Sequence, residues 1–108
     1  MSTFTTSTIT KLVRDRIPEI AASRGQQLTI RYADAQEMCG LLRDKLIEEA
    51  AEVAAATPGE VLEELADVLE VVQALAEIHG YQLTDLDEAR ASKAAERGAF
   101  KLGVVATI

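Results

Sequence analysis

The chain has 108 residues, a length that suits one domain and leaves no room for a second hydrophobic core. Its 18 Asp and Glu against 11 Lys and Arg give a formal charge of -7, which argues against a broad basic surface for a nucleic acid polymer or an anionic membrane. Hydrophobic residues reach 48% but aromatic residues only 4%, a composition that favours aliphatic packing between helices over a β-sheet. We therefore expect a single all-α domain.

Three features of the sequence predict a cytoplasmic protein. The single cysteine, Cys39, cannot form an intramolecular disulfide. The first ten residues are rich in Ser and Thr and lack the cationic start and apolar run of a secretory signal. No apolar stretch approaches the roughly 20 residues that a membrane-spanning helix needs.

The first predicted element is a short helix within residues 11–25. Pro18 suits its first turn, and Gly25 ends it. Residues 27–33 alternate weakly between polar and apolar, but no other segment reads as a strand that could pair with them. We interpret residues 27–33 as an extended connector.

Each of the next three elements opens with a polar residue followed three positions later by an acid, the pattern of a helix-capping box. These pairs are Asp34 and Glu37, Thr57 and Glu60, and Thr84 and Asp87. They predict long helices over 35–56, 58–79 and 85–97, the last two ending at Gly80 and Gly98. A chain this small buries only about two thirds of its unfolded surface. We therefore expect a homodimer or homotetramer that completes a four-helix core.

Two of the predicted helices carry pairs of acids at a spacing of three, which places both members on one helix face. At about 100° per residue, Glu49 and Glu64 fall inside the apolar arcs of their helices. Glu52 and Asp67 fall at the edges of the same arcs. Other acids of the second helix fall on the opposite side, toward water: Glu63, Glu70 and Glu77.

Four carboxylates that point inward repel one another, and each is costly to bury unpaired. Mg²⁺ resolves both problems, because it takes oxygen ligands and helical bundles build such sites from acids on facing helices. The alternative is that Lys45, close in helical phase to Glu49 and Glu52, neutralises part of an internal ion-pair network. Helical phase alone leaves both interpretations open.

These motifs resemble those of the MazG-like, all-α nucleoside triphosphate pyrophosphohydrolases, a superfamily that also includes phosphoribosyl-ATP pyrophosphohydrolase and dimeric dUTPases. The superfamily carries EExxE on one helix and ExxD on the next, matched here by Glu48, Glu49, Glu52, Glu64 and Asp67. A small single-domain subgroup opens with KLVRDxIPE, here residues 11–19. It closes with KxxxRGxF, here Lys93, Arg97, Gly98 and Phe100.

The resemblance implies a MazG-like helical bundle that hydrolyses the bond between the α and β phosphates of a nucleotide, with a role in clearing the nucleotide pool. It implies that Mg²⁺, replaceable by Mn²⁺, is bound by Glu49, Glu52, Glu64 and Asp67. Glu48 would then orient or deprotonate the attacking water. The substrate stays open among nucleoside triphosphates, dUTP and phosphoribosyl-ATP.

The triphosphate also needs positive charge, which this acidic chain offers only in small clusters. Candidates for phosphate contact are Lys45, Lys11, Arg14, Lys93 and Arg97. Lys93 and Arg97 share a helical face near a C-terminus, where they could equally serve only to complement the helix dipole. The competing functional class is a non-enzymatic helical interaction module, in which apolar faces bind a partner and the acids provide solubility.

Overall fold

The computed structural model describes residues 9–108, and this part of the chain contains four α-helices and no strand. The helices are α1 (Ile17–Ser23), α2 (Ala35–Ala55), α3 (Val61–Ile78) and α4 (Leu83–Arg97). The prediction of an all-α fold is confirmed for these residues. None of the described helices is both long and apolar enough to cross a membrane. The prediction that the first ten residues form no secretory signal concerns mostly residues 1–8, which lie outside the described part of the chain.

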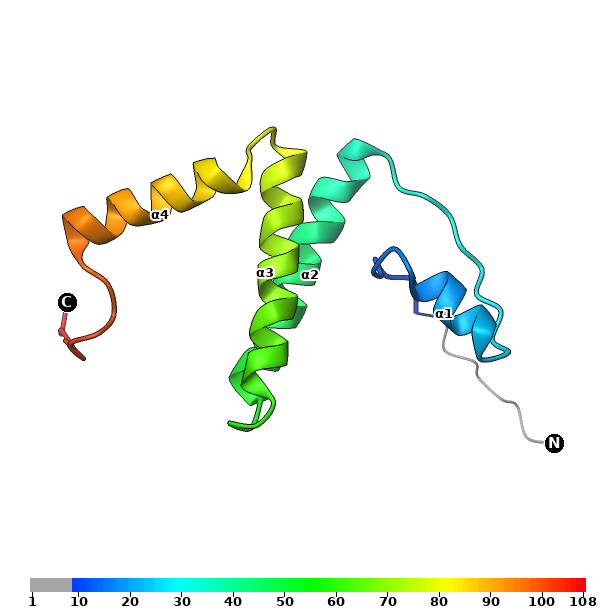
Figure 1. The fold of residues 1–108 in the computed structure, drawn as a ribbon, viewed down its shortest axis with the longest axis horizontal. Coiled ribbons are helices and arrows are strands. Elements are labelled where there is room, and N and C mark those ends of the chain that lie inside the picture. Colours follow the sequence, from blue (N-terminus) through cyan, green and yellow to red (C-terminus); the bar gives the residue numbers. More distant parts are fainter. Residues whose placement is uncertain (1–8) are drawn as a thin grey trace.

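The helices form an open arch around one central hairpin (Figure 1). Helices α2 and α3 run side by side in opposite directions and make the main helix contact of the chain. Helix α4 touches α3 and then projects away on one side, whereas α1 lies on the other side of the hairpin (Figure 1). The backbone of α1 comes close to no other helix within residues 9–108.

The segment before α2 matches its predicted local structure. Pro18 stands in the first turn of α1, which begins one residue earlier than the proline. Gly25 takes a positive φ of 78°, the left-handed conformation that glycine adopts without strain, and so ends the helix turn. The connector is extended and unpaired, and Arg31 donates to both carboxylate oxygens of Glu37, at 2.6 and 2.7 Å. This bidentate pair ties the connector to the first turn of α2.

One of the three predicted helix starts is confirmed, and two are displaced. Asp34 caps α2 as predicted, because its carboxylate accepts a hydrogen bond from the Glu37 amide at 2.8 Å. Helix α3 begins at Val61 and not at position 58, since Thr57 and Glu60 form a separate turn. The Glu60 carboxylate accepts from both the amide and the hydroxyl of Thr57, at 3.1 and 2.8 Å.

The predicted cap of α4 at Thr84 is wrong. The helix starts at Leu83, where Gln82 and Asp85 form a capping box and the Asp85 carboxylate accepts from the Gln82 amide at 2.8 Å. The turn at Gly80, with a φ of 83°, ends α3 and leads directly into this earlier start. Leu86 is then half-buried and lines a pocket together with side chains of α3. Helix α4 therefore uses the earlier of two overlapping capping patterns.

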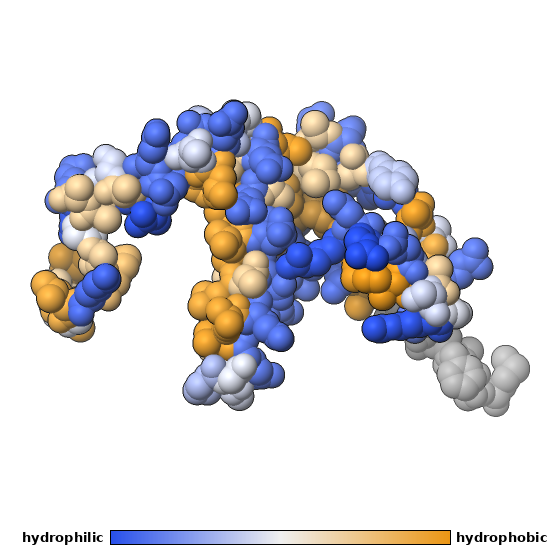
Figure 2. All heavy atoms as spheres, viewed as in Figure 1, coloured by the Kyte–Doolittle hydropathy of each residue, from blue (hydrophilic) through white to orange (hydrophobic). Residues whose placement is uncertain are grey.

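The described chain buries very little of itself. Its buried apolar residues are Ala21, Leu42 and Val71 alone among residues 9–108. The radius of gyration is 18.5 Å, whereas a compact chain of this length has about 13 Å. Apolar side chains stay exposed along the α2–α3 hairpin, and Figure 2 shows them gathered below α4. One chain therefore forms a hairpin with two loosely attached flanks, and not a closed four-helix bundle.

Candidate metal centre

The central hairpin brings the two predicted acid pairs together. One carboxylate oxygen each from Glu49, Glu52, Glu64 and Asp67 lies within 4.8 Å of the others. The sequence explains this convergence once the hairpin is known, because Glu52 and Glu64 are each six residues from Pro58, and Glu49 and Asp67 are each nine. In an antiparallel pair of helices, positions at equal distance from the turn lie level with each other. We call these four residues the acid cluster.

Glu49 is the deepest member of the acid cluster. It is only 7% exposed, and it is the one buried charged residue in the described part of the chain. Its Oε1 lies 3.5 Å from Nζ of Lys45, but its Oε2 is buried without a hydrogen-bond partner, as is Oε2 of Glu64. Buried carboxylate oxygens rarely stay unpartnered in folded proteins. These two oxygens therefore fit the ligand atoms of a cation site.

The surroundings of Glu49 disfavour its negative charge. Burial is the main cause that raises the pKa of the Glu49 carboxyl, and the neighbouring Glu52 carboxylate raises it further. Lys45 opposes this rise without cancelling it. A cation among the four carboxylates would reverse the balance by stabilising the ionised form.

Lys45 and Lys11 place positive charge at the edge of the acid cluster. Nζ of Lys45 lies 3.6 Å from Oε2 of Glu48, in addition to its contact with Glu49. Nζ of Lys11 lies 3.6 Å from the other oxygen of Glu48. Glu48, the predicted base, therefore stands beside the cluster between two ammonium groups.

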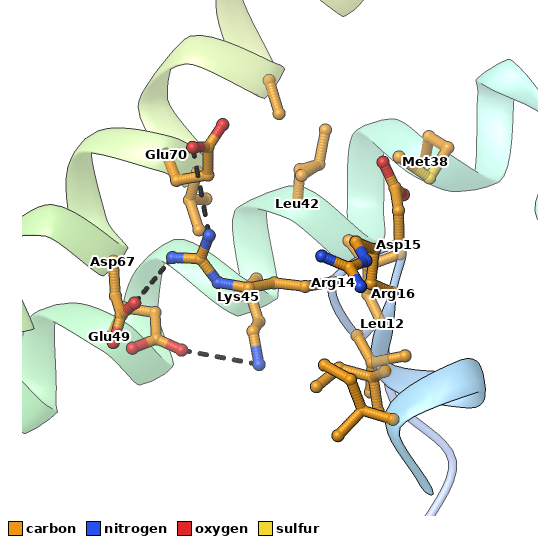
Figure 3. A pocket seen from close by; sticks show the side chains of 15 residues that line it. Leu12, Arg14, Asp15, Arg16, Met38, Leu42, Lys45, Glu49, Asp67 and Glu70 are labelled. Atoms are coloured by element: carbon orange, nitrogen blue, oxygen red, sulfur yellow. Dashed lines mark hydrogen bonds and ion pairs between the residues drawn. The ribbon is translucent and has the colours of Figure 1, made fainter. Parts of the chain in front are cut away.

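Arg14 makes the shortest contact to the acid cluster. Its guanidinium donates to Oδ1 of Asp67 at 2.6 Å and lies 3.9 Å from Oε1 of Glu70. In Figure 3 the Arg14 side chain reaches from the N-terminal segment to α3, with its guanidinium between these two acids. Glu70 is exposed, as helical phase predicts, yet it joins the site. Its position three residues after Asp67 was the signal that could have indicated this.

A cavity of about 470 Å³ separates the N-terminal segment from the hairpin. Its polar wall includes Lys45, Glu49 and Asp67 (Figure 3). Its apolar wall comes from both sides of the gap and includes Leu12, Ile17, Ile20, Met38 and Leu42. The pocket is open to solvent and combines apolar walls with a few polar groups, as small-molecule sites do.

Two predicted phosphate contacts lie elsewhere in the single chain. Lys93 and Arg97 are on α4, which projects from the hairpin on the side opposite α1 (Figure 1). Neither residue joins the carboxylates in the described part of one chain. The direction of α4 depends on the turn at Gly80 and on packing against α3, which helical phase does not report.

Six carboxylates and three cations meet around this centre when Glu48 and Glu70 are counted with the acid cluster. Lys45 does pair with two acids, as the ion-pair interpretation requires, but the local excess of three negative charges remains. A divalent cation suits such an excess. No family model, curated protein or solved structure matches the chain. The MazG-like resemblance therefore rests on the motifs quoted above.

Proposed function

We propose that the protein is a cytoplasmic, Mg²⁺-dependent nucleoside triphosphate pyrophosphohydrolase of the MazG-like type. It hydrolyses the bond between the α and β phosphates, so that a nucleoside monophosphate and pyrophosphate leave, and it serves to clear the nucleotide pool. The observation that carries the proposal is the convergence of four carboxylates, with one ligand oxygen of each within 4.8 Å of the rest. These are the residues that the EExxE and ExxD motifs single out.

The donor set fits Mg²⁺, with Mn²⁺ able to replace it. All four donors are carboxylate oxygens, the ligand type that both ions accept, and no thiolate or imidazole is among them. Two of the donors carry buried oxygens without a partner. When bound, the metal ion supplies charge neutralisation for the phosphates and lowers the pKa of an attacking water.

In this proposal, the positions of Glu48, Lys45, Lys11 and Arg14 around the acid cluster indicate their roles in the reaction. Glu48, beside the acid cluster and partly exposed, takes the proton of the attacking water. Lys45 neutralises charge that develops on the phosphate oxygens, since its side chain is held between Glu48 and Glu49 at the cavity wall. Lys11 and Arg14 bind the outer phosphates from the other side of the cavity.

The working form in this proposal is a homodimer or homotetramer with a completed four-helix core. The chain exposes 9708 Å², whereas a folded monomer of this mass exposes about 5,800 Å². Stable obligate interfaces bury roughly 2,000–5,000 Å² in total. The uncovered apolar residues of α3 supply suitable contact surface, and they include Leu62, Leu65 and Leu69.

The experiment that tests the function is incubation with a panel of nucleoside triphosphates, deoxynucleoside triphosphates, dUTP and phosphoribosyl-ATP, with and without Mg²⁺. We expect Mg²⁺-dependent pyrophosphate release from at least one substrate. Exclusive cleavage of dUTP or of phosphoribosyl-ATP would identify one of the narrower activities. Glu64→Gln should lower the rate at least about a hundredfold, whereas Glu63→Gln, the same change one residue earlier on the exposed face, should not.

A protein that releases pyrophosphate from no nucleotide, and whose melting temperature is unchanged by Mg²⁺ or Mn²⁺, would contradict the proposal. The non-enzymatic interaction module would then be the better interpretation. The convergence of acids from two helices around the buried Glu49 argues against that alternative, because acids that serve only solubility would spread over exposed faces.

A further inference from the structure

The segment before α1 supplies two of the three cations beside the acid cluster. We call residues 11–16 the N-terminal arm. Its Arg14 donates to Asp67 at 2.6 Å, and its Lys11 lies 3.6 Å from Glu48. The arm is not helical before position 17, and α1 behind it packs closely against no other described helix. The arm contacts the hairpin through these ion pairs, and apolar side chains such as Leu12 face the hairpin across the same pocket.

We propose that the N-terminal arm is a metal-coupled strap: Arg14 holds Asp67 in the metal-free protein, and a divalent cation in the acid cluster competes with it. The inference rests on the proposed metal site and adds a partner to it. Asp67 is both the acceptor of the Arg14 hydrogen bond and a member of the four-carboxylate cluster. A guanidinium and a divalent cation that share one carboxylate repel each other. Two cations on one carboxylate would lie within the screening length of about 8 Å at physiological ionic strength, so salt would not remove this repulsion.

Of the three cations, Arg14 is the one that a bound metal ion can displace. Lys45 is only 17% exposed in its side chain, and its backbone is held on α2 at helical spacing from Glu48 and Glu49, so a change of its rotamer leaves it next to the same acids. Lys11 contacts Glu48, which lies outside the acid cluster. Arg14 alone combines a contact to a cluster residue with a position on a non-helical segment.

The competition is reciprocal by thermodynamic linkage. If the Arg14 contact lowers the affinity for the metal by some factor, bound metal lowers the affinity of the arm for Asp67 by the same factor. A guanidinium freed from a carboxylate is well suited to bind phosphate oxygens in the same bidentate manner. Metal loading therefore prepares the arm to exchange a carboxylate for a phosphate of the substrate.

The first test measures Mn²⁺ affinity by titration with electron paramagnetic resonance detection, at low salt and without nucleotide. Arg14→Met should bind Mn²⁺ at least about fivefold more tightly than the wild type. Arg16→Met is the matched control, because it makes the same change on the same arm but Arg16 pairs with Glu19 of α1, at 2.7 Å. Circular dichroism checks that both variants keep the helix content of the wild type.

The Mn²⁺ titration distinguishes failure of the strap from failure of the proposed metal site. Tighter binding by Arg14→Met alone supports the strap. Equal or weaker binding by Arg14→Met, with normal binding by the wild type, overturns the strap and leaves the proposed metal site intact. If neither the wild type nor Arg14→Met binds Mn²⁺, the metal site and the strap both fail.

The second test follows release of the arm in the wild-type protein by limited trypsin digestion with mass spectrometry. Cleavage after Lys11, Arg14 and Arg16 should become faster when Mn²⁺ is added. Cleavage after Arg31 is the internal control, since Arg31 is tied to Glu37 and not to the acid cluster. Unchanged cleavage of the arm under conditions where Mn²⁺ is bound overturns the release of the strap.

Discussion

The central hairpin and the two flanks of this molecule, α1 with the segment before it and α4, differ in how their candidate site residues are positioned. In the α2–α3 hairpin, four acids from two helices meet within 4.8 Å, and one of them is buried. In the flanks, α1 packs closely against no described helix and α4 touches only α3. Arg14 of one flank reaches the site through an ion pair, whereas Lys93 and Arg97 of the other lie on the far side of the hairpin.

The hairpin by itself therefore brings together the four acids and Lys45, whereas Lys11 and Arg14 reach them only from a flank. A short turn between two helices brings positions that are symmetric about it to the same level, so the acids meet with no help from the flanks. The other candidate cations, those of the arm and of α4, come from segments whose direction depends on tertiary packing. The following predictions test this contrast between hairpin and flanks.

The largest expected effect compares a lysine of the hairpin with a lysine of the flank. Lys45→Met should lower kcat/KM for the active nucleotide roughly a hundredfold, because it removes a cation placed against developing phosphate charge. Lys93→Met makes the same change on α4, away from the acid cluster of its own chain, and should cost clearly less. Steady-state kinetics of pyrophosphate release measures both. Equal losses would mean that α4 contributes to the site as directly as the hairpin does.

The next effect concerns the uncovered apolar face of α3. Leu69→Asp places a charge among residues that we expect at a subunit interface, so it should shift the mass measured by light scattering from the oligomer toward the monomer. Leu102→Asp is the control, because Leu102 is the more exposed leucine and lies in the non-helical tail. A monomeric wild-type protein, or an equal shift in both variants, would contradict an interface on this face.

The smallest expected effect is a pH dependence of the melting temperature, caused by Glu49. Its pKa in the folded protein is raised above the ordinary value of 4.5, so the folded state holds this proton more firmly than the unfolded chain. The resulting contribution to stability is present below pH 4.5 and is lost as the pH rises through the raised pKa. Without metal, the melting temperature of the wild type should therefore fall relative to Glu49→Gln over this rise in pH.

Saturating Mg²⁺ should reverse the order of these melting temperatures at neutral pH, because the cation stabilises the ionised carboxylate that Glu49→Gln lacks. Glu77→Gln, an exposed change on α3, should follow the wild type in both conditions. If Mg²⁺ raises the melting temperature of Glu49→Gln as much as that of the wild type, Glu49 is not a ligand.

The starts of α2 and α4 show when a capping pattern in the sequence predicts the first residue of a helix. Asp34 caps α2 as its spacing with Glu37 predicts, since no competing pattern lies nearby. At α4 two capping patterns overlap, and the one at Gln82 and Asp85 is used in place of Thr84 and Asp87. Thr is the more usual N-cap residue, so the local pattern alone favours Thr84. The earlier start at Leu83 instead accompanies the turn at Gly80 and the contact of α4 with α3.

The helical class, the long helices and the four acids that meet between α2 and α3 could be predicted from the sequence, because periodicity and spacing act within one helix or across one short turn. The structure leaves one of these acids, Glu52, exposed. The sequence also marked Lys45, which shares a helix with Glu48 and Glu49. Only the tertiary structure decided that Arg14 contacts Asp67, that Glu70 joins them and that Lys93 and Arg97 stand apart. Those relations depend on how the flanks lie against the hairpin, and that placement follows from long-range ion pairs and packing, which leave no periodic signal in the chain.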